Sequence, residues 1–186
     1  MSKIHRRTML RGIVAAVAGT AVTVLSSQAA YAAFSPPVRG RRYQRYGGHN
    51  FTPTSTLKDE QRTDWTYNDN GSIYVAGTPR PFQTRLQLPQ GAVIEEVQFS
   101  YFLGSLPPMD FLLLAFDNAG GFQPNSPSAQ AVAVGTSIQT ISLSGLPVRV
   151  DNAAWNYVIR WAPTVAGPDQ ILWGARVAYR SPEGGD

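Results

Sequence analysis

Carboxylates are the side chains of this sequence best suited to acid–base chemistry. Glycoside hydrolysis needs one carboxylic acid and one carboxylate, held about 5 to 9 Å apart on any fold. No spacing in the sequence joins two acidic residues into such a pair, so we predict no catalytic residues and a protein that is not an enzyme. A carboxylate-dependent glycan hydrolase or lyase stays as the last alternative. It would use Glu95 or Glu96 with one of Asp64, Asp69, Asp117 or Asp151.

Glu95 is the acidic residue with the most unusual position. It falls on the same face of a predicted strand as Val97 and Phe99. Burial on that face would raise the pKa of its carboxyl group. In the alternative interpretation, Glu95 lies at the end of the strand and pairs with an arginine such as Arg85 or Arg176. The two interpretations differ in whether the carboxylate faces the core.

Aromatic residues suggest a second chemistry, the stacking of a flat ring on a sugar. Trp65, Tyr67 and Trp155 stand in polar, loop-like sequence, and we take them as candidate ligand-binding residues. Packing over a loop is the alternative for these three. Trp161 and Trp173 fall on apolar strand faces, where a core position is expected.

Cysteine and histidine limit the remaining chemistry. The sequence has no cysteine, which excludes disulfides, thiolate metal sites and a cysteine nucleophile. His49 is the only histidine after residue 32, and no Gly-x-Ser-x-Gly motif accompanies it. The segment 68–71, Asn-Asp-Asn-Gly, lacks the flanking carboxylates of a helix-loop-helix calcium site and fits an Asx turn better. We predict no metal ion and no cofactor.

Residues 1–32 have the three parts of a cleaved export signal: a basic start, an apolar run of about fourteen residues, and Ala-Tyr-Ala at 30–32. The apolar run is too short to cross about 30 Å of hydrocarbon, and no second one follows. The mature chain is therefore expected to have no transmembrane span. The segment 6–11, Arg-Arg-Thr-Met-Leu-Arg, resembles the twin-arginine signal family; an ordinary secretory route is the alternative. We predict cleavage after Ala32 and a secreted or cell-surface protein, extracellular or periplasmic.

A basic stretch follows the signal. Residues 33–50 are rich in glycine and proline, a composition too poor in apolar residues to order itself, so we expect a flexible arm. The chain from Phe51 onward has eight basic and twelve acidic residues, a net charge of −4 that is opposite to the arm. The arm suits an anionic polymer such as a glycan, lipid headgroups, another surface protein or the acidic body of a second copy, and a solvated linker is the alternative. Its few charges do not suit nucleic acid. Its arginines are Arg39, Arg41, Arg42 and Arg45.

The body of the chain has the pattern of an all-β protein. Glycine and proline separate short runs rich in β-branched and aromatic residues. Residues 93–103 alternate between apolar and polar side chains and form the clearest strand; residues 82–88 alternate likewise and are expected to lie beside it. We predict a two-sheet antiparallel sandwich in jelly-roll or Greek-key order, with about eight strands over residues 51–182 and a tail at 183–186. The other strands are expected at 72–76, 111–116, 131–143, 157–161 and 171–179.

Three segments of the body, residues 88–94, 150–158 and 172–179, are similar to uncharacterised secreted β-sandwich proteins of bacteria. Some members of that family carry a cysteine pair near the positions held here by Ile73 and Trp173, and this chain departs from that pattern. The resemblance implies the fold and the exported location and brings no known activity.

Taken together, these features favour an exported, non-enzymatic β-sandwich module that acts as a cell-surface or extracellular-matrix interaction or structural protein. The first alternative is a carbohydrate-binding, lectin-like domain that uses Trp65, Tyr67 or Trp155.

Overall fold

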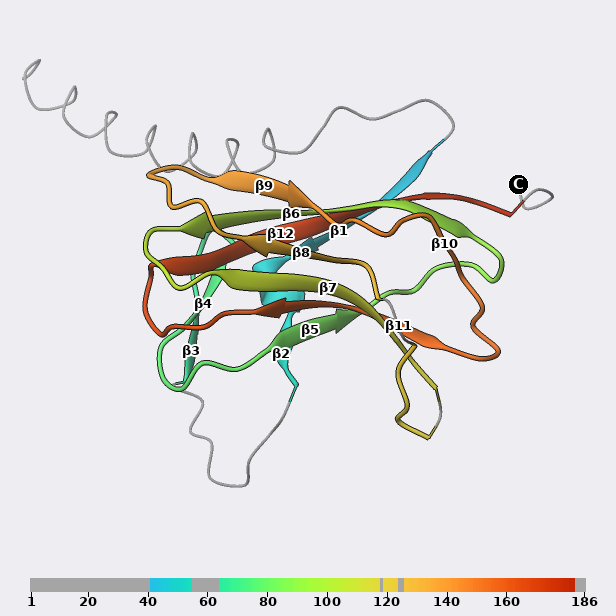
Figure 1. Cartoon of the computed structure of the whole chain (residues 1–186), viewed down its shortest axis with the longest axis horizontal. Coiled ribbons are helices and arrows are strands. Elements are labelled where there is room, and N and C mark those ends of the chain that lie inside the picture. The colour runs from blue at the N-terminus through green and yellow to red at the C-terminus, as the bar shows by residue number, and fades with distance from the viewer. Residues whose placement is uncertain (1–40, 55–63, 118, 124–125, 183–186) are drawn as a thin grey trace, which may run out of the picture.

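The computed structural model describes residues 41–54, 64–117, 119–123 and 126–182. Over these ranges the chain forms two antiparallel β-sheets that pack face to face (Figure 1). The all-β, two-sheet sandwich predicted from the sequence is confirmed. The predicted signal peptide, residues 33–40 of the arm with Arg39, and the C-terminal tail lie outside the described residues. Among the described residues, no helix has the length and apolar character needed to cross a membrane.

Sheet A is built on two long central strands, β6 and β12, which pair along most of their length. One edge of β12 pairs first with β4 and then with β1, while β9 and β10 pair with the free edge of β6. The strands of sheet A are β1 (Arg42–Gly47), β3 (Trp65–Tyr67), β4 (Ile73–Val75), β6 (Val93–Leu103), β9 (Gln139–Ser142), β10 (Val148–Arg149) and β12 (Gln170–Arg180).

Sheet B has the strand order β2-β5-β11-β7-β8. The pairing of β11 with β7 covers seven residues, and it forms the centre of the sheet. The strands of sheet B are β2 (Thr52–Pro53), β5 (Phe82–Arg85), β7 (Met109–Phe116), β8 (Ser128–Ala131) and β11 (Asn156–Ala162).

The core lies between the sheets and is rich in aromatic rings. Phe99 of β6 packs on Phe111 of β7 with ring centroids 4.6 Å apart, which joins the centres of the two sheets. Phe82 and Trp161 are both fully buried in sheet B, with centroids 5.7 Å apart. Burial of such large side chains contributes roughly 1.5–3 kcal/mol each to the free energy of unfolding. The core position predicted for Trp161 is therefore confirmed.

Two expectations about strand pairing are wrong. Residues 82–85 and 93–103 do form strands, but β5 belongs to sheet B and β6 to sheet A, because the connection between them crosses from one sheet to the other. The expected single strand at 131–143 is not formed: Ala131 ends β8 of sheet B, and within the range only 139–142 form a strand, β9 of sheet A. Between them, the Gly135 N–H donates to the carbonyl of Leu103 at 2.8 Å, which anchors this second crossing.

The expectation of a flexible arm is also wrong for residues 41–50. Residues 42–47 form β1, which pairs with β12 in continuous register from Arg42 opposite Tyr179 to Gly47 opposite Gly174. A single-turn 3-10 helix, η1 (Gly48–Asn50), follows. The segment is ordered because β12 offers an unpaired edge to its backbone and because Tyr46 packs against the core. A composition poor in apolar residues is therefore compensated by main-chain pairing.

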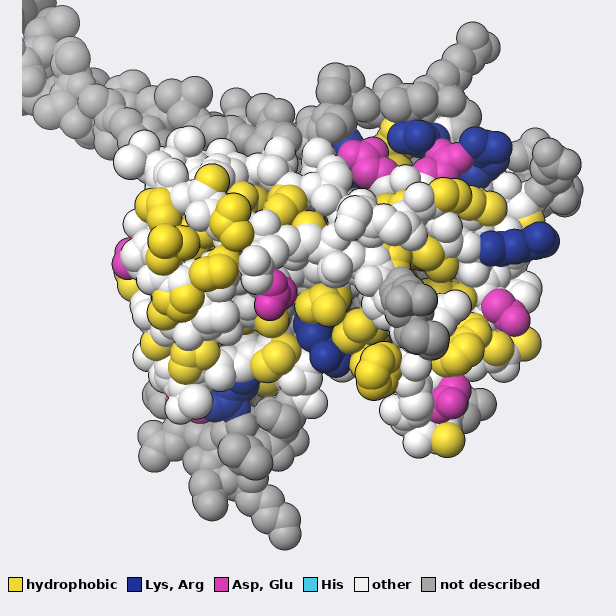
Figure 2. Space-filling view, in the orientation of Figure 1, with side chains coloured by type: hydrophobic (Ala, Val, Ile, Leu, Met, Phe, Trp, Pro, Cys, Tyr) yellow, Lys and Arg dark blue, Asp and Glu magenta, His cyan; other side chains and the backbone are white. Residues whose placement is uncertain are grey.

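The opposite charges of arm and body meet within one chain. Arg41 Nε lies 2.5 Å from Glu95 Oε2, and Arg180 also pairs with Glu95. Arg176, which is 1% exposed, lies 3.3 Å from Glu96 and places its guanidinium over the ring of Tyr43. Figure 2 shows basic and acidic side chains interleaved near the start of β1. One arginine of the arm thus pairs with acidic residues of its own body.

Candidate functional site

A β-bulge interrupts β12 at the point where its neighbour changes. Leu172 lies opposite Ile73 of β4, whereas Gly174 lies opposite Gly47 of β1. On the other edge, Leu172 faces Tyr101 and Gly174 faces Ser100, so Trp173 is an extra residue with no partner in the ladder. A bulge of this kind redirects a side chain. Trp173 is half-buried here and does not join the core, so its predicted core position is wrong.

Two glycines allow β1 and η1 to approach this bulge. A Cβ atom on Gly174 would lie 2.4 Å from the carbonyl oxygen of Tyr46. A Cβ on Gly48 would lie 2.8 Å from backbone atoms of Gly71, Ile73 and Leu172. Since real side chains do not come so close to backbone, only glycine fits at either position.

The loop residues beside the bulge are held by hydrogen bonds. The His49 N–H donates to the Gly71 carbonyl at 3.3 Å. The Gly47 N–H donates to Asn50 Oδ1 at 2.9 Å, and Asn70 Oδ1 accepts from the backbone N–H and the hydroxyl of Ser72. The first of these bonds joins η1 to the turn before β4, and the others hold each segment internally.

The bulge, η1 and the turn before β4 together enclose a cavity of about 250 Å³, which we name the Trp173 pocket. Ser100 of β6 reaches it from the outer face of sheet A, because its neighbours Phe99 and Tyr101 face the core. Tyr46 also lines the pocket; burial is the main cause that raises the pKa of its hydroxyl, which donates to Gln44 Oε1 at 2.5 Å. The lining residues are Arg45, Tyr46, Gly47, His49, Asn50, Asn70, Gly71, Ser100, Trp173, Gly174 and Ala175.

Two buried polar atoms of the pocket have no hydrogen-bond partner among the described residues. They are the indole Nε1 of Trp173 and the hydroxyl of Ser100, a residue that is 1% exposed. Leaving such a group unpaired costs about 1–3 kcal/mol. Both atoms are closed off from solvent, so they are unpaired groups within the wall of the cavity.

The lining of the pocket is suited to binding and lacks the groups for hydrolysis. None of its residues is acidic, so it offers no carboxylate pair and no carboxylate to orient His49. Over the ranges that the structure describes, no three histidine, aspartate or glutamate side chains gather as metal ligands. An aromatic ring, amides and a hydroxyl in a small cavity are the chemistry of recognition.

The structure places the three predicted aromatic residues elsewhere. Trp65 packs edge-on against Phe82 with centroids 5.9 Å apart and lies against the core. Trp155 also packs against the core, just before β11, whereas Trp65 and Tyr67 belong to β3. Tyr67 is 43% exposed, and its hydroxyl donates to the Phe51 carbonyl. They form no common surface: β3 and the start of β11 lie at opposite ends of the sandwich (Figure 1).

Glu95 does not face the core. Glu96 lies opposite Ala178 and Ile94 opposite Tyr179, so Glu95 is the extra residue of a second bulge, this time on β6. The bulge turns both glutamates outward between Ile94 and Val97, which are fully buried. The interpretation in which Glu95 pairs with an arginine is right, but its partners are Arg41 and Arg180.

The other candidate carboxylates serve local structure. Asp64 pairs with Arg80 at 2.6 Å, and Asp117 accepts hydrogen bonds from the N–H groups of its own turn. Asp151 accepts from Gln90 and from the Ala153 N–H, and these bonds, led by the one from Gln90, lower the pKa of its carboxyl group. Asp69 is exposed.

Of the predicted arm contacts, Arg45 alone lines the pocket, while Arg41 joins the glutamates and Arg42 is exposed. Sequence reasoning missed Trp173 and Ser100. The available signal was the Trp173-Gly174 pair, because a glycine inside a strand often marks a bulge.

The sequence matches no family model, and no curated protein is similar to it. Solved structures show distant likenesses. The GH26-CBM35 β-(1,4)-mannanase of Podospora anserina has a TM-score of 0.46 and 11% identity over 76% of this chain, which spans only 28% of that protein. The C-terminal CBM6 of the laminarinase LamC of Zobellia galactanivorans has a TM-score of 0.45 and 9% identity, covering 73% of this chain and 98% of that one. The CBM35 of Cellvibrio japonicus Abf62 has a TM-score of 0.44 and 14% identity, covering 77% and 100%.

Proposed function

We propose that this protein is an exported, non-catalytic β-sandwich module that binds carbohydrate through the Trp173 pocket. The observation behind the proposal is the pairing of a half-buried indole with unpaired hydrogen-bonding groups in one cavity. This favours the carbohydrate-binding alternative over a general interaction module. It replaces Trp65, Tyr67 and Trp155 with Trp173 as the ring that contacts the sugar.

A sugar matches both parts of the lining, the aromatic ring and the hydrogen-bonding groups. The C–H face of a pyranose ring stacks on an aromatic side chain, and its hydroxyl groups accept and donate hydrogen bonds. The Trp173 indole supplies the apolar surface. The exposed amides of Asn50 and Asn70 supply polar partners. The enclosed Nε1–H of Trp173 and hydroxyl of Ser100 become partners where the sugar displaces the wall of the cavity.

The size of the pocket limits the ligand to one sugar unit. Pockets for drug-sized ligands hold about 300–1,000 Å³, and this one holds about 250 Å³. A single residue at a chain end or on a side branch fits such a volume better than the middle of a polymer chain.

Affinity gel electrophoresis against a panel of soluble polysaccharides, followed by titration calorimetry, tests the proposal. We expect at least one polysaccharide to retard the wild-type protein and Trp173→Ala to abolish the retardation. Phe122→Ala is the matched control, because Phe122 is an aromatic residue 67% exposed on the other sheet. Equal loss in both variants, or no retardation by any glycan, would overturn the proposal.

Ser100→Ala separates binding from folding. Removing a buried hydroxyl that has no partner relieves the cost of leaving it unpaired. We expect this variant to unfold at or above the wild-type urea midpoint and to bind the retarding glycan about tenfold more weakly, the loss of about one hydrogen bond. Unchanged binding would show that the sugar does not reach Ser100.

Export is the second part of the proposal, supported by the basic, apolar and Ala-Tyr-Ala segments of residues 1–32. The change Arg6→Lys with Arg7→Lys is expected to retain the protein in the cytoplasm, which would assign the twin-arginine route. Continued export of this variant would assign the general secretory route. A wild-type protein that stays in the cytoplasm with its first 32 residues attached would refute export.

A further inference from the structure

An exposed apolar cluster lies at one end of the sandwich. Leu106, Val132 and Val134 are 60%, 58% and 50% exposed, and we name these three side chains the apolar tips. Leu106 belongs to the loop between β6 and β7, and the two valines belong to the loop between β8 and β9. Figure 2 shows hydrophobic side chains gathered at this end, where β8 ends and β9 begins. None of the three lines the Trp173 pocket.

The two loops are fastened to each other at both ends. At the end of β6, the Leu103 carbonyl accepts from the Gly135 N–H at 2.8 Å. At the start of β7, Met109 pairs with Ala131, the last residue of β8. Both loops therefore run side by side between these two attachments, which gives the apolar tips one common surface.

Backbone groups of these loops are satisfied within the protein. The Ala133 carbonyl accepts from Gln139 Nε2 at 3.2 Å, and the Pro107 carbonyl accepts from Gln170 Nε2 at 2.6 Å. Pro107 and Pro108 have no N–H group that would need a partner. A backbone held in this way can leave water without losing its hydrogen bonds, which is the condition for contact with hydrocarbon.

The loops stand in the least charged part of the sequence. Residues 97–109 and 118–148 include no aspartate, glutamate, lysine, arginine or histidine. Two acidic residues adjoin the first loop: Asp110 follows it in β7, and the carbonyl of the exposed Asp169 accepts from the Gly104 N–H at 2.7 Å. The apolar tips themselves carry no charge that would oppose their transfer from water. The loops also offer no basic residue to attract an anionic surface.

The size of the cluster favours a lipid surface over a second copy. A stable dimer buries about 800 Å² and roughly 20–30 residues on each partner, more than two short loops supply. Reversible attachment to a bilayer needs less apolar surface, since a single myristoyl chain gives an association constant of about 10⁴ M⁻¹.

We propose that the apolar tips place this end of the sandwich against a lipid bilayer whose headgroups carry no net charge. Leu106, Val132 and Val134 enter the boundary between headgroups and acyl chains, and the strands behind them stay in water. The attachment is peripheral and reversible. It gives the protein a second binding surface, separate from the Trp173 pocket and independent of any sugar.

The lack of cysteine makes a local test possible, because one introduced cysteine takes one label. In Ala133→Cys the environment-sensitive fluorophore NBD would lie between the two valines, and all three apolar tips remain. Ala153→Cys is the matched control, an exposed alanine before β11 at the opposite end of the sandwich (Figure 1). With the full chain and phosphatidylcholine vesicles, we expect NBD emission at residue 133 to rise about threefold or more. A nitroxide-bearing lipid should quench it, and the control should not respond.

Removing the apolar tips should weaken the contact without harming the fold. Val132→Ser with Val134→Ser, in the labelled Ala133→Cys chain, should need about tenfold more lipid for half of the emission change. Phe122→Ser removes an exposed apolar side chain from the other loop region and should leave the lipid dependence unchanged. The urea midpoints should stay at the starting value, because these side chains lie outside the core.

Four results would overturn the proposal. The first is no emission change at residue 133, and the second is an equal change at residue 153. The third is stronger binding when phosphatidylglycerol replaces part of the phosphatidylcholine, which would assign the contact to basic residues elsewhere. The fourth is a doubled mass in lipid-free solution that the two valine substitutions abolish, which would assign the apolar tips to a second copy. None of these results bears on glycan binding, whose test uses no lipid.

Discussion

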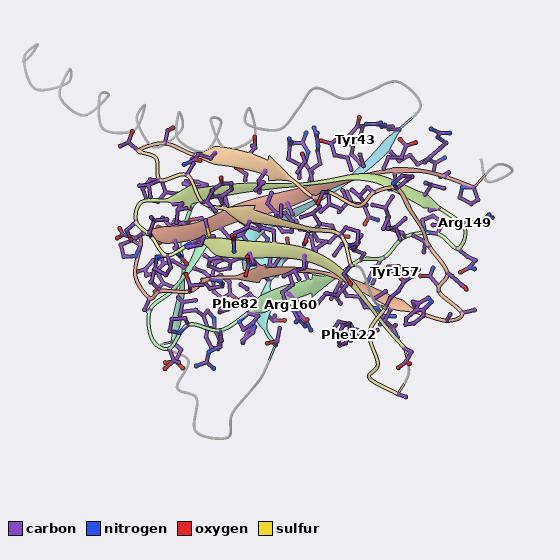
Figure 3. The ribbon with its side chains drawn as sticks, in the orientation of Figure 1. Tyr43, Phe82, Phe122, Arg149, Tyr157 and Arg160 are labelled. Atoms are coloured by element: carbon purple, nitrogen blue, oxygen red, sulfur yellow. The ribbon has the colours of Figure 1, made fainter. Side chains whose placement is uncertain are left out.

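The outer faces of the two sheets both carry an arginine and an aromatic residue, and on sheet A the two line one cavity. On sheet A, Arg45 and Trp173 line a cavity of about 250 Å³. On sheet B, Arg160 lies over the ring of Phe116 at 5.6 Å and donates from Nη2 to Gln83 at 2.9 Å, while Phe122 is 67% exposed on the loop after β7 (Figure 3).

The difference follows from regularity. The centre of sheet B is an unbroken ladder of β11 and β7 with no register shift. Its outer face buries the pair Leu114 and Val158 and has a smaller cavity of about 60 Å³ beside β7. Sheet A contains two bulges and a change of neighbour along β12, and these irregularities create the pocket. The comparison teaches that ladder defects, more than composition, distinguish a binding pocket from a surface in this fold.

The substitution Gly174→Ala, next to Trp173, should have the largest effect on stability and binding. In Gly174→Ala the new Cβ meets the Tyr46 carbonyl oxygen at 2.4 Å, so β1 must move away from β12. We expect the free energy of unfolding in urea to fall by about 2–4 kcal/mol and glycan binding to disappear. Gly120→Ala, on the sheet B side, has open space around the new atom and costs only the penalty of its positive φ, about 1–2 kcal/mol. Equal costs for the two variants would contradict the close packing of β1.

Arg176 of sheet A and Arg160 of sheet B should differ in how much each contributes to stability. Arg176→Met leaves Glu96 with Arg41 alone, 3.6 Å away, and should cost about 1–3 kcal/mol in urea unfolding. Arg160→Met removes a hydrogen bond to the neutral Gln83 and should cost about 0.5–1.5 kcal/mol. A double variant, Arg176→Met with Glu96→Leu, should recover part of the loss, since neither charge is then left without its partner. The reverse order of the two single costs would refute this comparison.

Alkaline pH should weaken sheet A in particular. Burial is the main cause that raises the pKa of Tyr46, Tyr67 and Tyr101 above the ordinary value of 10.0, and all three belong to sheet A. The folded state then keeps protons that the unfolded state releases, so stability is full below pH 10 and falls as the pH rises through the folded pKa values. Urea midpoints measured between pH 8 and 11 should decline above 10. The decline should be smaller in Tyr101→Phe, and a flat profile would contradict the burial of these hydroxyls.

Phe122→Ala should have the smallest effect. An exposed side chain outside the core contributes less than about 0.5 kcal/mol to stability, and we expect glycan affinity to stay within twofold of the wild type. Calorimetry of Phe122→Ala and Trp173→Ala with the same ligand gives the ratio of the affinities lost on the two faces. A greater loss in Phe122→Ala than in Trp173→Ala would move the binding site to sheet B.

Wherever a strand is regular, the sequence was sufficient to predict where it lies and which of its side chains face the core. Alternation alone located β6 at 93–103 and identified Trp161 as a core residue. It could not place Glu95 or Trp173, because one extra residue in a strand reverses the face of everything beside it and leaves no trace in a period-two pattern. Nor could it find β1, whose order depends on the edge of a strand far along the chain.

The two bulges cancel each other. Outside them, the numbers of the two residues in each β6–β12 pair add up to one constant value, as in Leu172 opposite Tyr101 and Tyr179 opposite Ile94. Between them that sum is larger by one, as in Val177 opposite Val97. The Trp173 pocket and the acidic Glu95 position can thus be described as one-residue insertions that compensate for each other in an otherwise regular ladder. Deleting Trp173 together with Glu95 would restore a single uninterrupted alignment. Deleting either alone would leave one bulge, with the pairs on its two sides shifted by one residue relative to each other.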